Sequence, residues 1–96
     1  MSDELLNGLD AAAPLGERGL SKLRWRCRRG LLENDLFIER FFLRHESRLT
    51  VGQARALYVL MDLSDNDLLD LLLRRNELPQ DINQEDVQEV LSMLRQ

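Results

Sequence analysis

The sequence has 96 residues, of which 44% are hydrophobic and 31% are charged, a composition typical of one globular domain with a single modest core. Aromatic residues, which are enriched in strands, make up only 5% of the sequence, so an all-β fold is disfavoured. The two prolines are too few for a proline-rich linker. The formal net charge of −4 argues against nucleic acid and anionic membrane surfaces as partners.

Several other classes of protein are disfavoured by what the sequence lacks. Cys27 is the single cysteine, so the chain cannot form an internal disulfide, and no Cys/His set suggests a metal site. No apolar run approaches the roughly 18 residues of a membrane span. The first residues are acidic, unlike a secretory signal or an arginine-rich transit peptide. We therefore expect a cytoplasmic protein without stable membrane insertion.

The chain begins with a stretch of small residues that lacks periodicity. We predict that residues 1–18 form a flexible N-terminal arm and that residues 19–96 form the folded domain. Ser21 is a favourable N-cap for a first helix, which Gly30 would end. Spacings of three and four residues place its apolar side chains on one side: Leu20, Leu23 and Cys27.

The middle of the chain predicts two more helices. Residues 31–45 carry a broad apolar stripe and are predicted to form the central helix of the core: Leu32, Leu36, Phe37, Phe41 and Phe42. Thr50 and Gln53 form a potential capping box for a third helix. Its predicted buried face consists of Val51, Ala54, Leu57, Tyr58 and Met61.

The last third of the sequence predicts a fourth and a fifth helix. Ser64 followed by Asp67 begins a leucine-dense helix over residues 65–75, which should contact several neighbours because it is apolar on all sides. A final helix is expected from Asn83, packing through Val87, Val90, Leu91 and Leu94. The fold class is therefore all-α, a single compact bundle of about five short helices. A tetratricopeptide array is not supported, because its 34-residue pattern is absent.

The segment from Trp25 to Asp35 is the most unusual part of the sequence. It combines a tryptophan, a basic cluster, a lone glycine and two carboxylates within one helix–glycine–helix step. Gly30 lacks a Cβ, so another backbone could approach it closely. This combination predicts a docking surface.

The basic residues and the tryptophan each allow two interpretations. Arg24 and Arg26 could form a solvated face near a helix end, where cations are favoured by about 0.3–1 kcal/mol each. Arg28 and Arg29 stand close to acidic residues in sequence and suit bidentate pairing with a carboxylate, within the chain or across an interface. Trp25 falls off the apolar stripe of its helix. It could cover the edge of a neighbouring helix or form a partly exposed interface hot spot.

The remaining chemistry-bearing residues do not predict catalysis. Cys27 is expected to be a small buried residue. Glu33 and Asp35 could each interact with a helix dipole, and they diverge by about 200° on a helix, so they do not form an acid/base pair. His45 is expected at the surface, at a helix end. We predict no catalytic, cofactor-binding or metal site.

Residues from about Leu23 to Leu94 resemble the succinate dehydrogenase assembly factor family, which includes the bacterial FAD assembly factor SdhE and its mitochondrial counterpart. The resemblance is carried by the pattern Trp25-x-Cys27-Arg28-Arg29-Gly30-x-x-Glu33-x-Asp35. Phe41-Phe42 and a later Asp67-Leu68 before a leucine-rich helix extend it.

The resemblance implies a function that the residues alone do not. It implies a five-helix chaperone that promotes covalent attachment of FAD to the flavoprotein subunit of succinate dehydrogenase and, in some bacteria, of fumarate reductase. Attachment is thought to be autocatalytic in that subunit, so no enzymatic activity and no bound cofactor are expected here. The implied partner-binding residues are Trp25, Arg28, Arg29, Gly30, Glu33 and Asp35.

Two alternative functions are weighed beside this one. Members of this family have also been labelled antitoxins, and a small acidic helical protein could neutralise a toxin by binding it. A nucleic-acid-binding regulator would depend on the basic cluster between Arg18 and Arg29 and would show strongly salt-dependent affinity.

Overall fold

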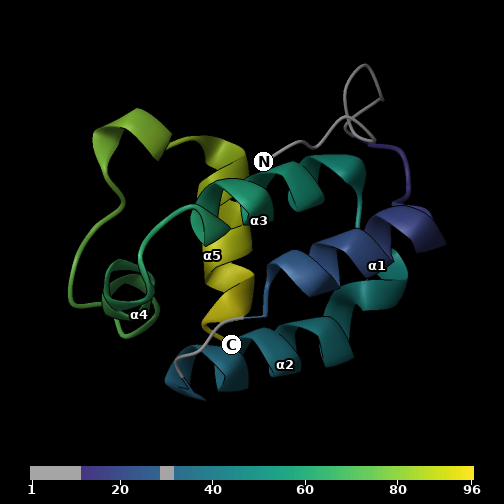
Figure 1. Cartoon of the computed structure of the whole chain (residues 1–96). Coiled ribbons are helices and arrows are strands. Elements are labelled where there is room, and N and C mark those ends of the chain that lie inside the picture. Colours follow the sequence, from purple (N-terminus) through teal and green to yellow (C-terminus); the bar gives the residue numbers. More distant parts are fainter. Residues whose placement is uncertain (1–11, 29–31) are drawn as a thin grey trace.

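The computed structural model describes residues 12–28 and 32–96. The described residues form five α-helices and two short 3-10 turns, with no strand among them (Figure 1). The helices are α1 (Glu17–Arg26), α2 (Leu32–His45), α3 (Val51–Met61), α4 (Asp65–Leu72) and α5 (Glu85–Leu94), and the turns are η2 (Glu46–Arg48) and η3 (Gln80–Ile82). The predicted all-α fold of about five short helices is confirmed.

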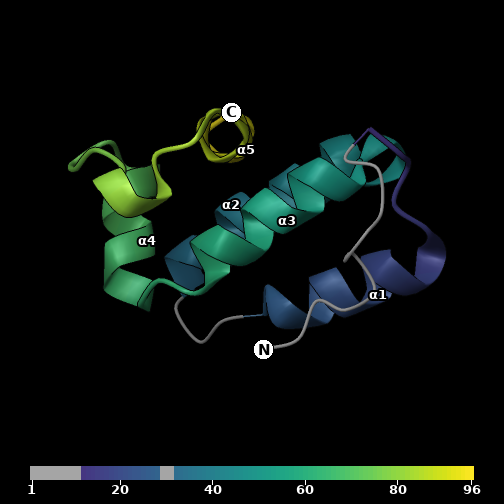
Figure 2. The same cartoon turned by 90° about the horizontal axis from the view of Figure 1, so that it is seen from above.

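The helices pack in two directions. The first three helices, α1, α2 and α3, lie along one another, whereas α5 crosses them and is seen end-on when the molecule is viewed from above (Figures 1 and 2). Extensive packing joins α3 to α5, and α4 contacts both α2 and α5. None of the described helices is long and apolar enough to span a membrane.

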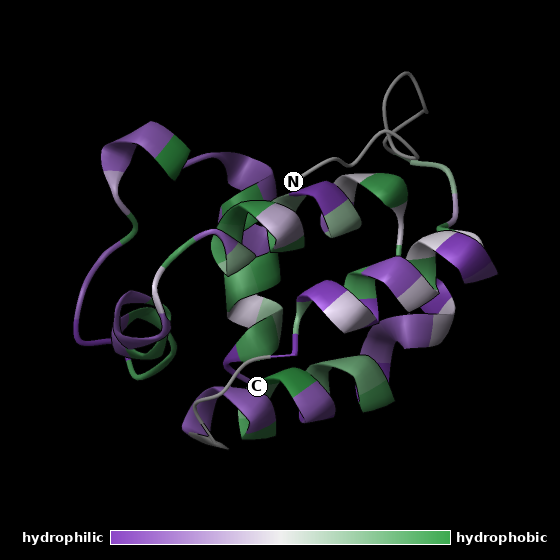
Figure 3. Ribbon diagram, in the orientation of Figure 1, coloured by the Kyte–Doolittle hydropathy of each residue, from purple (hydrophilic) through white to green (hydrophobic). Residues whose placement is uncertain are grey.

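The centre of the core is α3, not the predicted α2. Buried residues lie on all sides of α3 rather than on one face, and they include Val51, Gly52, Ala54, Ala56, Leu57, Leu60 and Met61. Three of these are glycine or alanine, whose small side chains allow neighbouring helices to approach closely. In Figure 3 the hydrophobic residues of α5 lie directly behind this helix.

Two predicted helix starts are confirmed in atomic detail. Thr50 accepts a hydrogen bond on Oγ1 from the backbone N–H of Gln53 at 3.2 Å, and the Gln53 side chain accepts one from the Thr50 N–H at 3.1 Å. Ser64 likewise accepts from the Asp67 N–H at 3.1 Å. These local bonds satisfy helix N–H groups that would otherwise have no partner, so the sequence alone locates them.

The first helix begins at Glu17, four residues before the predicted N-cap Ser21. The preceding chain is held by backbone hydrogen bonds to the segment before α3. The Leu15 N–H donates to the Leu49 carbonyl at 2.9 Å, and the Val51 N–H donates to the Ala13 carbonyl at 2.9 Å. Because this pairing joins segments that are distant in sequence, no local sequence pattern predicts where α1 begins. Residues 1–11, most of the predicted arm, lie outside the described residues.

The end of α4 and the start of α5 also differ from the predicted boundaries. Helix α4 ends with Leu73 as its C-cap, and α5 begins at Glu85 rather than Asn83, after the turn η3. Arg74 adopts a positive φ of 63°. The N–H of Arg75 donates to the Asp70 carbonyl at 2.8 Å and so ends the helix. Arg74 thus takes the left-handed position after the C-cap that glycine usually occupies.

The same helix end is fixed from α5. The guanidinium of Arg95 donates from Nε and Nη2 to the Leu71 carbonyl at 2.9 and 2.6 Å. Burial and the nearby charge of Arg74 lower the pKa of Arg95. Arg95 therefore joins the C-terminal ends of α4 and α5.

Candidate functional site

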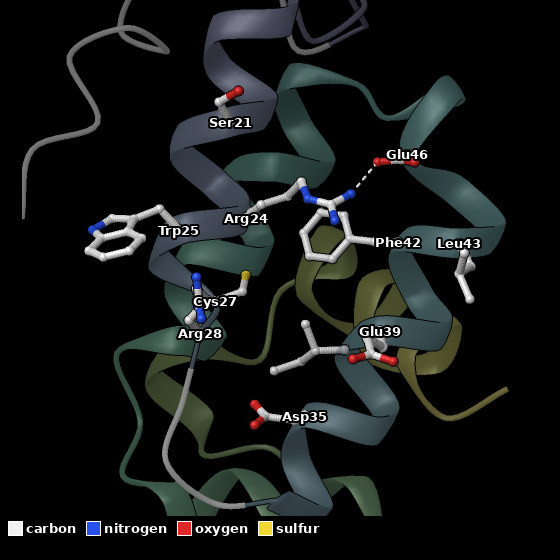
Figure 4. A pocket seen from close by; sticks show the side chains of 11 residues that line it. Ser21, Arg24, Trp25, Cys27, Arg28, Asp35, Glu39, Phe42, Leu43 and Glu46 are labelled. Carbon is white, nitrogen blue, oxygen red and sulfur yellow. Dashed lines mark hydrogen bonds and ion pairs between the residues drawn. The ribbon is translucent and has the colours of Figure 1, made fainter.

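An open groove of about 780 Å³ lies between α1 and α2. Figure 4 shows it from outside, with α1 along one side and α2 along the other. Helix α1 and the two residues after it contribute Trp25, Cys27 and Arg28, and α2 contributes Asp35, Ile38, Glu39, Phe42 and Leu43. Three of the six predicted docking residues, Trp25, Arg28 and Asp35, thus line one groove.

Two arginines of the basic cluster connect α1 to its neighbours. Arg24 lies over the Phe42 ring, 5.2 Å from its centroid, and forms a 2.5 Å ion pair with Glu46 in η2. Arg26 forms a 2.8 Å ion pair with Asp62, the C-cap of α3. Both residues lie in the last turn of α1, as the helix-end interpretation expects, and the Arg24 side chain is about half exposed, but each also pairs with a residue distant in sequence. Long-range pairing partners decide their role, and no local pattern identifies these partners.

Trp25 is exposed rather than packed against a neighbouring helix. Its side chain is 72% exposed and points away from α2, at the outer margin of α1 (Figure 4). The guanidinium of Arg28 lies 5.7 Å from the centroid of the Trp25 ring, within cation–π distance. Tryptophan and arginine are both enriched among the interface residues that contribute most to binding energy.

A buried asparagine orients the two predicted carboxylates. Asn34 is fully buried and donates from Nδ2 to the Asp65 carbonyl at 3.0 Å, which ties the start of α2 to the start of α4. Glu33 and Asp35 lie about 100° to either side of it around the helix. Asp35 is half-buried and lines the groove, whereas Glu33 is exposed and does not. The expected divergence therefore places the two acids in different surroundings.

The apolar stripe of α2 is shifted from the predicted one. Ile38, Phe41 and Phe42 are buried, but Leu36 is 56% exposed. Leu43 is exposed still further, to 80%. The prediction that Leu36 belongs to the core was wrong because α2 is rotated so that the buried Asn34 faces inward.

The predicted burial is confirmed for Cys27, whereas the predicted surface position of His45 is not. Cys27 is buried, as predicted, and its side chain faces the space between α1 and α2 (Figure 4). His45 was expected at the surface but is half-buried, with its ring 5.3 Å from that of Phe41. Its Nε2 atom is buried and makes no hydrogen bond to another described residue. Residues Arg29 and Gly30 of the predicted docking surface lie outside the described residues.

Four residues that line the groove were not named from the sequence, Ile38, Glu39, Leu43 and Glu46, of which Glu39 and Leu43 are exposed on α2. A glutamate and a leucine on an amphipathic helix are ordinary, and only the rotation of α2 places them at the groove. Within the part of the chain that the structure describes, no three His, Cys, Asp or Glu side chains are grouped to hold a metal ion.

Comparisons with known proteins identify the family of the chain. The family model described as flavinator of succinate dehydrogenase matches residues 21–96. A protein of Ralstonia nicotianae named FAD assembly factor SdhE is 52% identical over 75 residues, covering 78% of this chain and 79% of the relative. No solved structure is significantly similar to the chain.

More distant relatives carry the same name. FAD assembly factor SdhE of Legionella pneumophila is 32% identical over 81 residues, covering 84% of this chain and 96% of the relative. That of Coxiella burnetii is 42% identical over 52 residues, covering 54% and 63%. The family model covers α1 from Ser21 onward and all of α2, and every residue that lines the groove lies within it. The chain is a member of the family of flavinators of succinate dehydrogenase.

Proposed function

We propose that this chain binds the flavoprotein subunit of succinate dehydrogenase and promotes covalent attachment of FAD to it. The observation that carries this proposal is the exposed Trp25–Arg28 pair at the C-terminal end of α1, which lines the same groove as Asp35 of α2 within the region shared with the family. Exposing so large an aromatic side chain to water is unfavourable unless a partner covers it. The free-energy cost grows with the apolar area that is exposed.

The proposed role is that of a chaperone rather than an enzyme. The relatives that match the chain are named assembly factors, and this name supports a chaperone role. The chain would bind a conformation of the flavoprotein in which its own groups react with FAD, and such selective binding shifts the flavoprotein towards that conformation. We further propose that it acts in the cytoplasm, that the flavoprotein of fumarate reductase is a second partner, and that Arg29, Gly30 and Glu33 complete the docking surface.

Deleting the gene and measuring covalent flavin tests this proposal. In-gel flavin fluorescence of the succinate dehydrogenase flavoprotein should be lost on deletion and restored by the wild-type chain. Complementation with Gly30→Arg should fail, because an added side chain would block close approach of the partner, provided that circular dichroism shows the variant to be folded. Undiminished fluorescence in the deletion strain would refute the function.

A titration with FAD separates a chaperone from a cofactor carrier. The purified chain should bind the apo-flavoprotein but show no stoichiometric binding of free FAD. Tight binding of FAD to the isolated chain would instead assign it a carrier role. Recovery of a toxin without any flavoprotein in a pull-down would favour the antitoxin alternative.

A further inference from the structure

Two carboxylates on the α2 side of the groove have no described partner. Asp35 and Glu39 both line the groove, and they are four residues apart, so they lie one above the other on the same side of the helix. Neither forms an ion pair with another described residue. The nearby Glu46, by contrast, is paired with Arg24. Among the described residues, the α2 side of the groove therefore presents two carboxylates that form no ion pair.

The same helix also exposes two leucines. Leu36 and Leu43 are 56% and 80% exposed and lie seven residues apart, hence two turns apart on one side of α2. Together with Trp25 they are three of the four large hydrophobic residues that the described part of the chain exposes. The fourth, Leu73, lies on α4. Exposed apolar area is thus concentrated on the face formed by α1 and α2.

The geometry sets the kind of partner this face fits. Leu43 lies at the outer margin of α2 and Trp25 at the outer margin of α1, with the charged groups between them (Figure 4). A partner covering both margins would remove water from Asp35 and Glu39. Desolvated carboxylates are costly unless the partner supplies cationic hydrogen-bond donors. The complementary surface must therefore combine basic and apolar side chains.

We infer that the docking surface extends along α2 beyond the residues of the family pattern to Glu39 and Leu43. It takes a segment of the flavoprotein that places Lys or Arg side chains against Asp35 and Glu39 and an apolar side chain against Leu43. This inference rests on the proposed function, because the flavoprotein is the partner to which the segment belongs. The docking surface then runs from the start of α2 towards its C-terminal end.

Matched variants of exposed residues test the inference. The full chain is titrated into the apo-flavoprotein at several NaCl concentrations, using Leu43→Ser and Glu39→Gln. The controls are Leu73→Ser on α4 and Glu89→Gln on α5, which change an exposed leucine and an exposed glutamate away from the groove. Circular dichroism melts confirm that all four variants are folded.

We expect each groove variant to weaken binding about five- to tenfold, the range of a significant interface residue, while the controls stay within about twofold of wild type. Glu39→Gln should also reduce the salt dependence of the affinity, because it removes one charge pair. Groove variants that bind like the controls would overturn the inference. A wild-type chain that does not bind the flavoprotein would instead refute the proposed function.

Crosslinking identifies the occupant directly. A photo-reactive residue introduced in place of Leu43 should capture a flavoprotein peptide that contains Lys or Arg, and mass spectrometry would identify it. Capture of an acidic flavoprotein peptide would contradict the charge assignment. Capture of a second copy of this chain, together with a dimer that Leu43→Ser dissociates in sedimentation experiments, would assign the face to self-association and refute the inference.

Discussion

The two halves of the molecule bury their side chains to very different extents. Seven of the eleven residues of α3 are buried, and α5 buries Val87, Val90, Leu91 and Leu94 against it. Within α1 only Leu23 is buried, and α2 exposes Leu36 and Leu43. The α3–α5 half thus contains most of the apolar packing, whereas the α1–α2 half carries exposed apolar and charged groups.

This difference separates folding from recognition. Burial of apolar area is the main favourable contribution to folding, so α3 and α5 should dominate the free energy of unfolding. The α1–α2 face retains apolar area that can be buried only by a partner. Changes to buried residues of α3 and α5 should therefore alter stability, and changes to exposed residues of α1 and α2 should alter binding.

The largest effect is expected from Leu57→Ala in α3. Leu57 is fully buried, so the lost apolar contacts and the resulting cavity should lower the free energy of unfolding by about 2–5 kcal/mol. Urea unfolding followed by circular dichroism measures this change. Leu43→Ala on α2 is the matched control and should change stability by no more than about 0.5 kcal/mol. An equal loss of stability in the two variants would contradict the proposed division between a half that stabilises the fold and a half that binds the partner.

The next largest effect is expected for Trp25→Ala, and on binding rather than on folding. Because the side chain is 72% exposed, stability should change by no more than about 0.5 kcal/mol. Affinity for the flavoprotein should fall by about 2 kcal/mol or more, as for an interface hot spot. Calorimetric titration tests this, with Trp25→Phe expected to lose less. An unchanged affinity would remove Trp25 from the docking surface.

Arg74→Gly should stabilise the protein without changing its affinity for the flavoprotein. Arg74 has a φ of 63°, a conformation that costs L-residues roughly 1–2 kcal/mol and that glycine adopts freely, although glycine loses more chain entropy on folding. The net gain should be about 1 kcal/mol or less, measured as a higher melting temperature. Arg74→Ala retains the unfavourable conformation and should not show this gain. A melting temperature that rises equally in both variants would exclude the backbone explanation.

The smallest effect is expected from the ion pair between Arg26 and Asp62, which joins α1 to α3. The Asp62 side chain is 72% exposed, so solvent screening should limit the coupling to about 0.2–1 kcal/mol. A double-mutant cycle with Arg26→Met and Asp62→Asn measures it, and the coupling should decrease in 1 M salt. Coupling well above this range would mean that electrostatic pairing, more than burial of Leu23, holds α1 in place.

The sequence alone determined those features that depend on neighbouring residues. The helix starts at Thr50 and Ser64 follow from side chains that bond to N–H groups three residues along the chain. The number of helices and the inward face of α1 follow from the spacing of apolar residues. The family resemblance was likewise contained in a short continuous pattern, which the comparisons support.

The tertiary structure decided what depends on distant residues. The rotation of α2, which buries Asn34 and exposes Leu36, is set by packing and by a hydrogen bond to α4. The start of α1 depends on backbone pairing with the segment before α3, and Arg24 acquires its role only where Glu46 and Phe42 approach it. A local sequence pattern specifies a helix and its polarity, but which side of that helix meets the core depends on the free energy of the whole packed assembly.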